Sequence, residues 1–167
     1  MATDKKQIED DIGDTPPPFE VEPSELDELT HAETLSLYRD AEDNIRFAKG
    51  LQWKTLGGTL AIFAALVVAC YAANPVEIFA KTCIVLSLVV SAGSIYSISI
   101  LQSWQNTERE KVEMSLRWFS NVFASIYGTK SRVEANIHRY ILISFMAITI
   151  LIANYLSVVL LMKIYRP

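Results

Sequence analysis

The sequence predicts an all-α, polytopic membrane protein with three transmembrane helices and cytosolic amphipathic helices. Residues 55–73, 82–101 and 140–162 contain no Asp, Glu, Lys or Arg. An apolar helix of about 20 residues spans the roughly 30 Å hydrocarbon core of a bilayer. The 167-residue chain is also 51% hydrophobic. Typical soluble domains are about 45–50% apolar and contain no long apolar runs, so this composition favours a membrane protein. Charged segments with helical periodicity flank the spans and account for the amphipathic helices.

The chain divides into five segments. Residues 1–23 carry several acidic residues and three consecutive prolines but few apolar side chains, so we expect a disordered acidic tail. Residues 24–54 form a cytosolic amphipathic helix, 55–101 a transmembrane hairpin, 102–139 a cytosolic helical hairpin, and 140–167 the third transmembrane helix with a short outside tail. The first segment lacks the basic start and apolar centre of a signal peptide. The first transmembrane helix is therefore expected to remain as the anchor.

The first amphipathic helix has two candidate start points. Ser24 can cap a helix, with Asp27 three residues on, whereas Thr30 and Glu33 have the spacing of a capping box and give the clearer signal. Gly50 is a weak point for helix continuity. The apolar stripe of this helix is expected to pack against the protein's own cytosolic helices, with a partner-binding face as the alternative. The stripe consists of Leu37, Tyr38, Ala41, Ile45, Ala48 and Leu51.

Small residues form a row along each of the first two spans. Lipid provides little hydrophobic drive between helices, so association depends on the close backbone approach that small residues permit. We expect the two spans to touch through these rows, with a pore lined by the serines as the alternative. We also expect one amide in the third span to bond to a neighbouring helix. The predicted helix-packing residues are Gly57, Ala61, Ala65, Ser87, Ser91, Gly93, Ser97 and Asn154.

A further apolar face lies between the second and third spans. Charged residues occupy the complementary positions, Gly128 ends the helix, and Ser131 with Glu134 opens the next one. The resulting hairpin either stands at the membrane surface or lies flat in the headgroups through its aromatic side chains. This face, for a partner or for the membrane surface, consists of Val112, Leu116, Trp118, Phe119, Phe123 and Ile126.

The distribution of charge predicts the orientation. Residues 1–50 hold 14 acidic and 5 basic residues, although the whole chain is only −4. Ten basic residues flank the spans on the side of the N-terminus and three on the other side. Because basic flanks remain in the cytosol, we expect a multi-pass protein of the cell inner membrane with a cytosolic N-terminus and an outside C-terminus.

Residues suited to catalysis or cofactor binding are sparse. The two histidines, His31 and His138, lie outside the spans, so the sequence offers neither paired haem ligands within the spans nor an HExxH zinc helix. No ionisable side chain lies at membrane depth, where a proton-coupled transporter needs one. We expect no enzyme activity, no catalytic residue, no cofactor, no metal and no nucleic-acid partner. Cys70 and Cys83 flank the turn symmetrically and are expected as free thiols, with a disulfide as the alternative.

The layout of the chain resembles one known family. A soluble helix with the sequence YRDA at 38–41 and RFA at 46–48 precedes a tight two-span hairpin, and charged helices follow Leu101 and Gln102. Over residues 31–135 this order is similar to the SLATT-type two-span domains of bacterial conflict systems. The resemblance implies a membrane effector that oligomerises into a pore when a sensor partner is activated. The third span departs from the two-span pattern.

Two functions of different class follow. The favoured one is a non-catalytic structural or assembly subunit that lies in the lipid bilayer and packs against copies of itself or a larger membrane complex. The alternative is an oligomeric pore-forming effector controlled by a cytosolic sensor partner. We favour the packing subunit because no ring of charge lines any span, and serines alone would form a pore of low selectivity.

Overall fold

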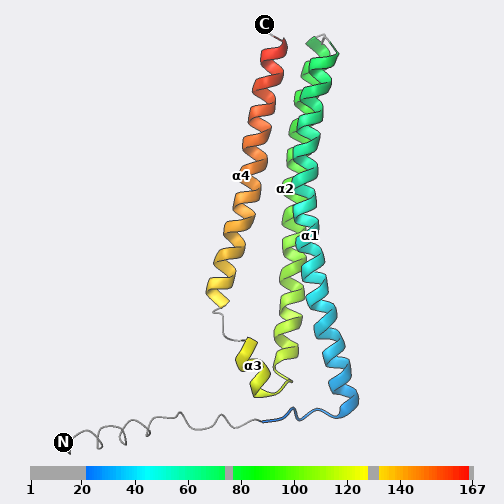
Figure 1. Cartoon of the computed structure of the whole chain (residues 1–167), viewed down its shortest axis with the longest axis vertical. Helices are drawn as coiled ribbons and strands as arrows, with labels where there is room; N and C mark the ends of the chain where they lie inside the picture. The colour runs from blue at the N-terminus through cyan, green and yellow to red at the C-terminus, as the bar shows by residue number, and fades with distance from the viewer. Residues whose placement is uncertain (1–21, 74–76, 128–131, 166–167) are drawn as a thin grey trace, which may run out of the picture.

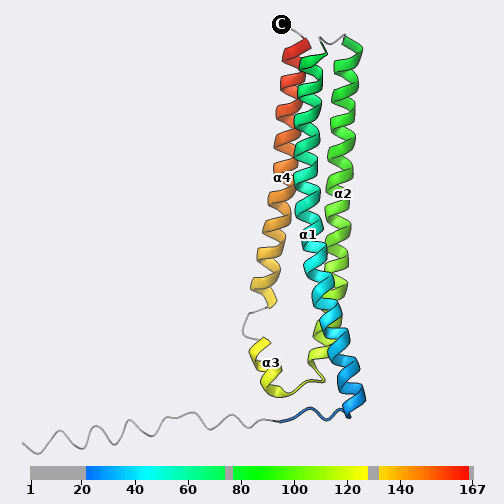
Figure 2. The ribbon, with the colours of Figure 1, turned by 45° about the vertical axis from the view of Figure 1, so that its right-hand side comes forward.

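The computed structural model describes residues 22–73, 77–127 and 132–165, and every regular element within these ranges is a helix. Helices α1 (Glu28–Ala72), α2 (Glu77–Leu116) and α4 (Arg132–Tyr165) are long, and α3 (Asn121–Tyr127) is short. α1 and α2 run antiparallel side by side (Figure 1). α4 lies beside the later part of α1 and the earlier part of α2, at the end of the molecule away from α3 (Figures 1 and 2). The described chain is thus an elongated three-helix bundle, which confirms the all-α class.

The three long helices are long and apolar enough to cross a membrane. We call the most apolar stretch of 18 residues in each helix its apolar window. The mean hydropathy of this window is 2.0 in α1, 2.1 in α2 and 2.3 in the part of α4 from Ile137 to Ile164. α1 has 45 residues, which at about 1.5 Å per residue makes a rod of about 68 Å. The hydrocarbon core of a bilayer is only roughly 30 Å thick. α1 and α2 therefore extend well beyond their apolar windows, towards the end that holds α3.

The first helix begins before the predicted capping box. Asp27 is the N-cap of α1, and its carboxylate accepts hydrogen bonds from the Thr30 amide and the Thr30 hydroxyl, both at 2.8 Å. The Thr30 amide is the main cause that lowers the pKa of Asp27. The capping box of Thr30 and Glu33 is wrong because both residues already lie inside the helix. Gly50 does not interrupt α1, which continues through it from Glu28 to Ala72.

The second helix continues through the predicted boundary at residue 101 and ends at Leu116. The amides of Arg117, Trp118 and Phe119 then donate to carbonyls three residues back, which forms a tight turn before α3. Residues 102–116 of the helical hairpin predicted for residues 102–139 are therefore the end of the same helix that contains the second span. The predicted break at Gly128, the cap at Ser131 and residues 1–21 of the tail predicted for 1–23 lie outside the described residues. Glu22, near the end of that tail, is described and donates from its amide to Asn121 Oδ1.

Three clusters of buried side chains follow one another along the bundle. Buried positions on α1 and α2 recur at intervals of three and four residues, as in an antiparallel coiled coil. The cluster nearest α3 shows that the stripe of the first amphipathic helix packs within the chain, as expected, although Leu37 is exposed. The clusters contain Cys70, Ala80, Cys83 and Leu161; Leu56, Phe63, Ile98, Met146 and Ile150; and Tyr38, Ala41 and Val112.

Candidate helix-packing site

Two pairs of polar side chains join the spans to one another. Asn154 of α4 donates from Nδ2 to Ser87 Oγ of α2 at 3.2 Å, and the hydroxyls of Thr59 on α1 and Ser94 on α2 lie 2.6 Å apart. The predicted bond from Asn154 to a neighbouring helix is confirmed. The Ser87 hydroxyl also donates to a carbonyl of its own helix, as serine commonly does in membrane helices. These hydroxyl groups are therefore satisfied inside the bundle.

A second polar network joins all three long helices where the apolar windows give way to charged sequence. Gln52 of α1 donates from Nε2 to the Ile98 carbonyl at 3.3 Å and to Gln102 Oε1 at 3.4 Å. Gln102 donates in turn to Asn106 Oδ1 at 3.0 Å, and Arg139 of α4 donates to the same oxygen at 2.7 Å. Sequence reasoning missed this network. Gln52 follows Ala48 by four residues and so continues the helical spacing of the apolar stripe. This spacing is the signal that could have placed Gln52 on the buried face.

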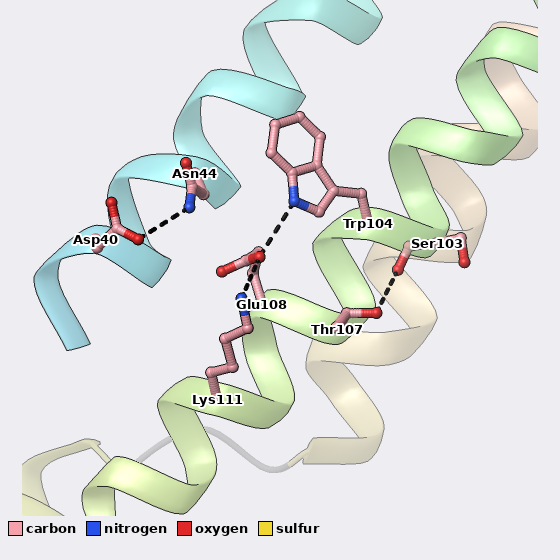
Figure 3. Close-up of polar contacts among 7 residues, drawn as sticks. All are labelled: Asp40, Asn44, Ser103, Trp104, Thr107, Glu108 and Lys111. Carbon is pink, nitrogen blue, oxygen red and sulfur yellow. Dashed lines mark hydrogen bonds and ion pairs between the residues drawn. The ribbon is translucent and has the colours of Figure 1, made fainter. Parts of the chain in front are cut away.

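Glu108 is a buried carboxylate on the part of α2 beyond its apolar window. It is 4% exposed, and its Oε1 accepts hydrogen bonds from Lys111 Nζ at 2.8 Å and from Trp104 Nε1 at 3.1 Å (Figure 3). The bond from Lys111 is the main cause that lowers the pKa of Glu108, although burial opposes it. Asn44 of α1 makes a smaller contribution in the same direction. Glu108 is thus held as an ion in the interface between α1 and α2.

The small-residue row of the first span faces away from the rest of the bundle. Gly57, Ala61 and Ala65 are all exposed, and a Cβ added at Gly57 would meet no heavy atom within 4 Å. The predicted contact between this row and the second span is therefore wrong. α1 instead packs through the larger side chains of Leu56 and Phe63 on its opposite side, because they bury more apolar area than alanine or glycine would.

The predicted row of the second span is divided between the inside and the outside of the bundle. Ser87 is 0% exposed and Ser91 is 6% exposed, so these two serines are helix-packing residues within the chain. Gly93 and Ser97 are exposed. Two residues correspond to a rotation of about 200° around a helix, so Gly93 must face the side opposite Ser91.

The apolar face predicted for residues 112–126 is also divided. Val112 is buried, and Leu116 and Phe119 pack against its cluster, so these three do not form a partner or membrane surface. The Phe119 ring makes edge contacts with His31 and Tyr38 at centroid distances of 5.6 and 5.9 Å. Trp118 and Phe123 remain exposed, at 61% and 38%. The side chain of Ile126 lies outside the described residues.

The end of α2 lies away from the apolar windows. Leu116 follows Leu101 on the same helix, and the 15 residues between them extend about 22 Å along the axis. The turn that holds Trp118 and Phe119 therefore follows the charged end of α2, and its posture relative to a membrane surface stays a prediction.

The two cysteines are free thiols, buried in one cluster at the end of the bundle opposite α3. Cys70 of α1 and Cys83 of α2 share this cluster with Leu161 of α4. Free thiols agree with the first of the two sequence expectations. Among the described residues, no group of three His, Cys, Asp or Glu side chains could hold a metal ion.

The arrangement therefore offers contact surfaces for other helices, in particular the exposed row of α1. Within the spans Asn154 pairs with Ser87 and Thr59 pairs with Ser94, and the titratable cluster around Glu108 lies beyond the apolar windows. Comparison with protein-family models, with curated proteins and with solved structures finds no match.

Proposed function

We propose that this chain is a non-catalytic, multi-pass protein of the cell inner membrane that acts as a structural or assembly subunit. It packs through its first span against copies of itself or against a larger membrane complex. The N-terminus and the extended ends of α1 and α2 lie in the cytosol, and the C-terminus lies outside. The observation that carries this proposal is the exposed small-residue row of α1, Gly57, Ala61 and Ala65.

The outer faces of the spans differ in a way that supports the proposal. The outer face of α4 carries large apolar side chains such as Ile148, Ile152 and Leu156, which are 54%, 55% and 54% exposed. Large apolar groups suit contact with lipid chains. The outer face of α1 instead brings its backbone close to the surface, with open space around Gly57. Such a surface favours a second helix, because helix association in lipid depends on close packing.

The test is the size of the full-length protein in mild detergent, measured by light scattering after size-exclusion chromatography. We expect the wild-type protein to exceed the mass of one chain, and Ala61→Leu or Ala65→Leu to shift it to smaller species. Ser144→Leu, an exposed small-to-large change on α4, is the matched control and should leave the size unchanged. A monomeric wild-type protein in detergent and in nanodiscs, or Leu variants with unaltered assembly, would contradict the proposal.

The pore-forming alternative makes a different prediction for the serines. Ser87, Ser91 and Ser94 are 0%, 6% and 9% exposed, so the bundle would have to rearrange before they could face water. We expect liposomes that contain the purified wild-type protein to retain their ions. Ion leakage that is lost with Ser91→Leu, but kept with the exposed control Ile148→Leu, would favour the effector implied by the SLATT resemblance.

A further inference from the structure

The end of the molecule farthest from the apolar windows combines two distant segments of the chain. The Glu22 amide donates to Asn121 Oδ1 at 3.1 Å, and Ser24 Oγ donates to the Trp118 carbonyl at 2.9 Å. The segment before α1 accordingly runs past the turn between α2 and α3 (Figure 2). We call the surface formed by residues 22–28 and 117–123 the tip.

Trp118 is the most exposed aromatic residue of the tip. It is 61% exposed, compared with 38% for Phe123, while the next residue, Phe119, packs its ring against His31 and Tyr38. The Trp118 carbonyl accepts a hydrogen bond from Ser24, so its backbone is joined to the segment before α1. Tryptophan is among the residue types enriched at the hot spots of protein interfaces. Trp118 therefore offers a large exposed aromatic surface for binding.

Exposed carboxylates lie on the segment that contacts the Trp118 backbone. The hydroxyl of Ser24 donates to the Trp118 carbonyl, and Glu22 and Glu25 belong to the same segment. The hydrogen bonds from Thr30 keep the pKa of Asp27 below its ordinary value, so its carboxylate stays charged. Within the two ranges of the tip there is one base, Arg117. The exposed acids of the tip are Glu22, Glu25, Asp27 and Glu28.

We propose that the tip binds a basic segment of a soluble protein partner, with an arginine or lysine side chain against the face of the Trp118 indole. Tryptophan is the best aromatic partner for such a cation, and the exposed carboxylates of the tip complement further basic residues. An anionic membrane surface is disfavoured as the occupant, because the same carboxylates repel it. The length of α2 beyond Leu101, about 22 Å, also separates the tip from the apolar windows.

The test uses the full-length protein in nanodiscs of zwitterionic lipid and a fluorescent arginine-rich peptide as the probe. Fluorescence anisotropy should show binding that weakens as salt is added. We expect Trp118→Ala to weaken binding by about tenfold or more, as for loss of an aromatic anchor. Trp53→Ala, which alters a 47% exposed tryptophan of α1 far from the tip, is the matched control. It should bind the peptide as the wild-type protein does.

A second pair of variants tests the charge. Glu25→Gln with Glu28→Gln should weaken peptide binding, whereas Asp43→Asn, an exposed acid farther along α1, should have little effect. Equal binding by the wild-type protein and Trp118→Ala would overturn the proposal, as would no binding of the peptide. Tighter attachment of the tip to vesicles of anionic lipid, lost with Trp118→Ala, would also overturn it. The tip is remote from Gly57 and Ala61. The size of the protein in detergent and its binding of the peptide therefore test the proposed function and the proposed tip site independently.

Discussion

Individual polar side chains in this protein are placed by the partner they find on another helix. Asn154 meets Ser87, and Thr59 meets Ser94. An unpaired amide or hydroxyl in a low-dielectric interior costs free energy, so each pair favours one alignment of its two helices. These bonds add little stability on average. Their main effect is to disfavour shifted alignments that would separate the partners.

Glu108 gives the pH prediction at the residue scale. Lys111 lowers the pKa of Glu108 below its ordinary value of 4.5, so the folded state prefers the ionised form. The stabilising contribution of the Glu108 ion pair is fully present at pH values above the ordinary pKa that Glu108 has in the unfolded chain. It is lost as the pH falls through the lowered folded-state pKa. We expect the thermal unfolding temperature of the wild-type protein in detergent to fall as the pH is lowered below 4.5.

The variant Glu108→Gln should lose this part of the pH dependence. At neutral pH it should be less stable by about 1–3 kcal/mol, because the Lys111 ammonium and the Trp104 N–H lose a charged acceptor. Glu110→Gln, an exposed acid on the same helix, is the control and should follow the wild-type profile. If Glu108→Gln and wild type show the same decline in unfolding temperature at acidic pH, the Glu108 ion pair is not the cause.

At the scale of the elements, the hairpin of α1 and α2 depends on alanines where the two helices come closest. Ala41 and Ala48 are 1% and 0% exposed on the inner side of α1. Ala61 is also an alanine of α1, but it is exposed. Replacing an inner alanine must therefore disturb the fold, whereas replacing the outer one changes only the exterior surface.

We therefore predict opposite effects for the same chemical change at two positions. Ala48→Leu inserts a larger side chain into a packed interface and should destabilise the protein by about 1–3 kcal/mol. Ala61→Leu should leave the unfolding temperature of the single chain within error of the wild-type value, when both are compared at a detergent concentration that dissociates the assembly. Thermal unfolding in detergent, followed by circular dichroism, measures both. Equal unfolding temperatures for wild type and Ala48→Leu would show that α1 and α2 do not pack as the structure has them.

At the scale of the whole molecule, the decisive property is the orientation across the membrane. Ten basic residues flank the spans on the side of the N-terminus and three on the other, and positive flanks stay in the cytosol. A reporter that works only outside the cytosol should therefore be active when fused after Pro167. The same reporter placed before Met1 should be inactive. Activity of a cytosolic reporter at Pro167 would reverse the topology.

The sequence by itself determined the number of the long apolar segments and that they are helical. This was possible because length and composition are local properties: residues 82–101 contain no charge, whatever their neighbours are. It also determined that Asn154 needs a partner, since a lone amide at that depth is unfavourable. The continuous helix from Glu77 to Leu116 was missed, because apolar and charged sequence can share one helix without a boundary signal.

Only the tertiary structure decided which face of each helix points inward. Helical periodicity places Gly57, Ala61 and Ala65 on one side of α1, but it does not say what lies opposite that side. The bundle buries Leu56 and Phe63 instead, because larger apolar side chains gain more from burial. Likewise, only the assembled structure shows that Phe119 packs against the cluster of Tyr38, Ala41 and Val112 while Trp118, one residue earlier, is left exposed at the tip. Which face of a helix becomes buried depends on which face gains more free energy from contact with the neighbouring helices. That comparison can be made only once the helices are assembled.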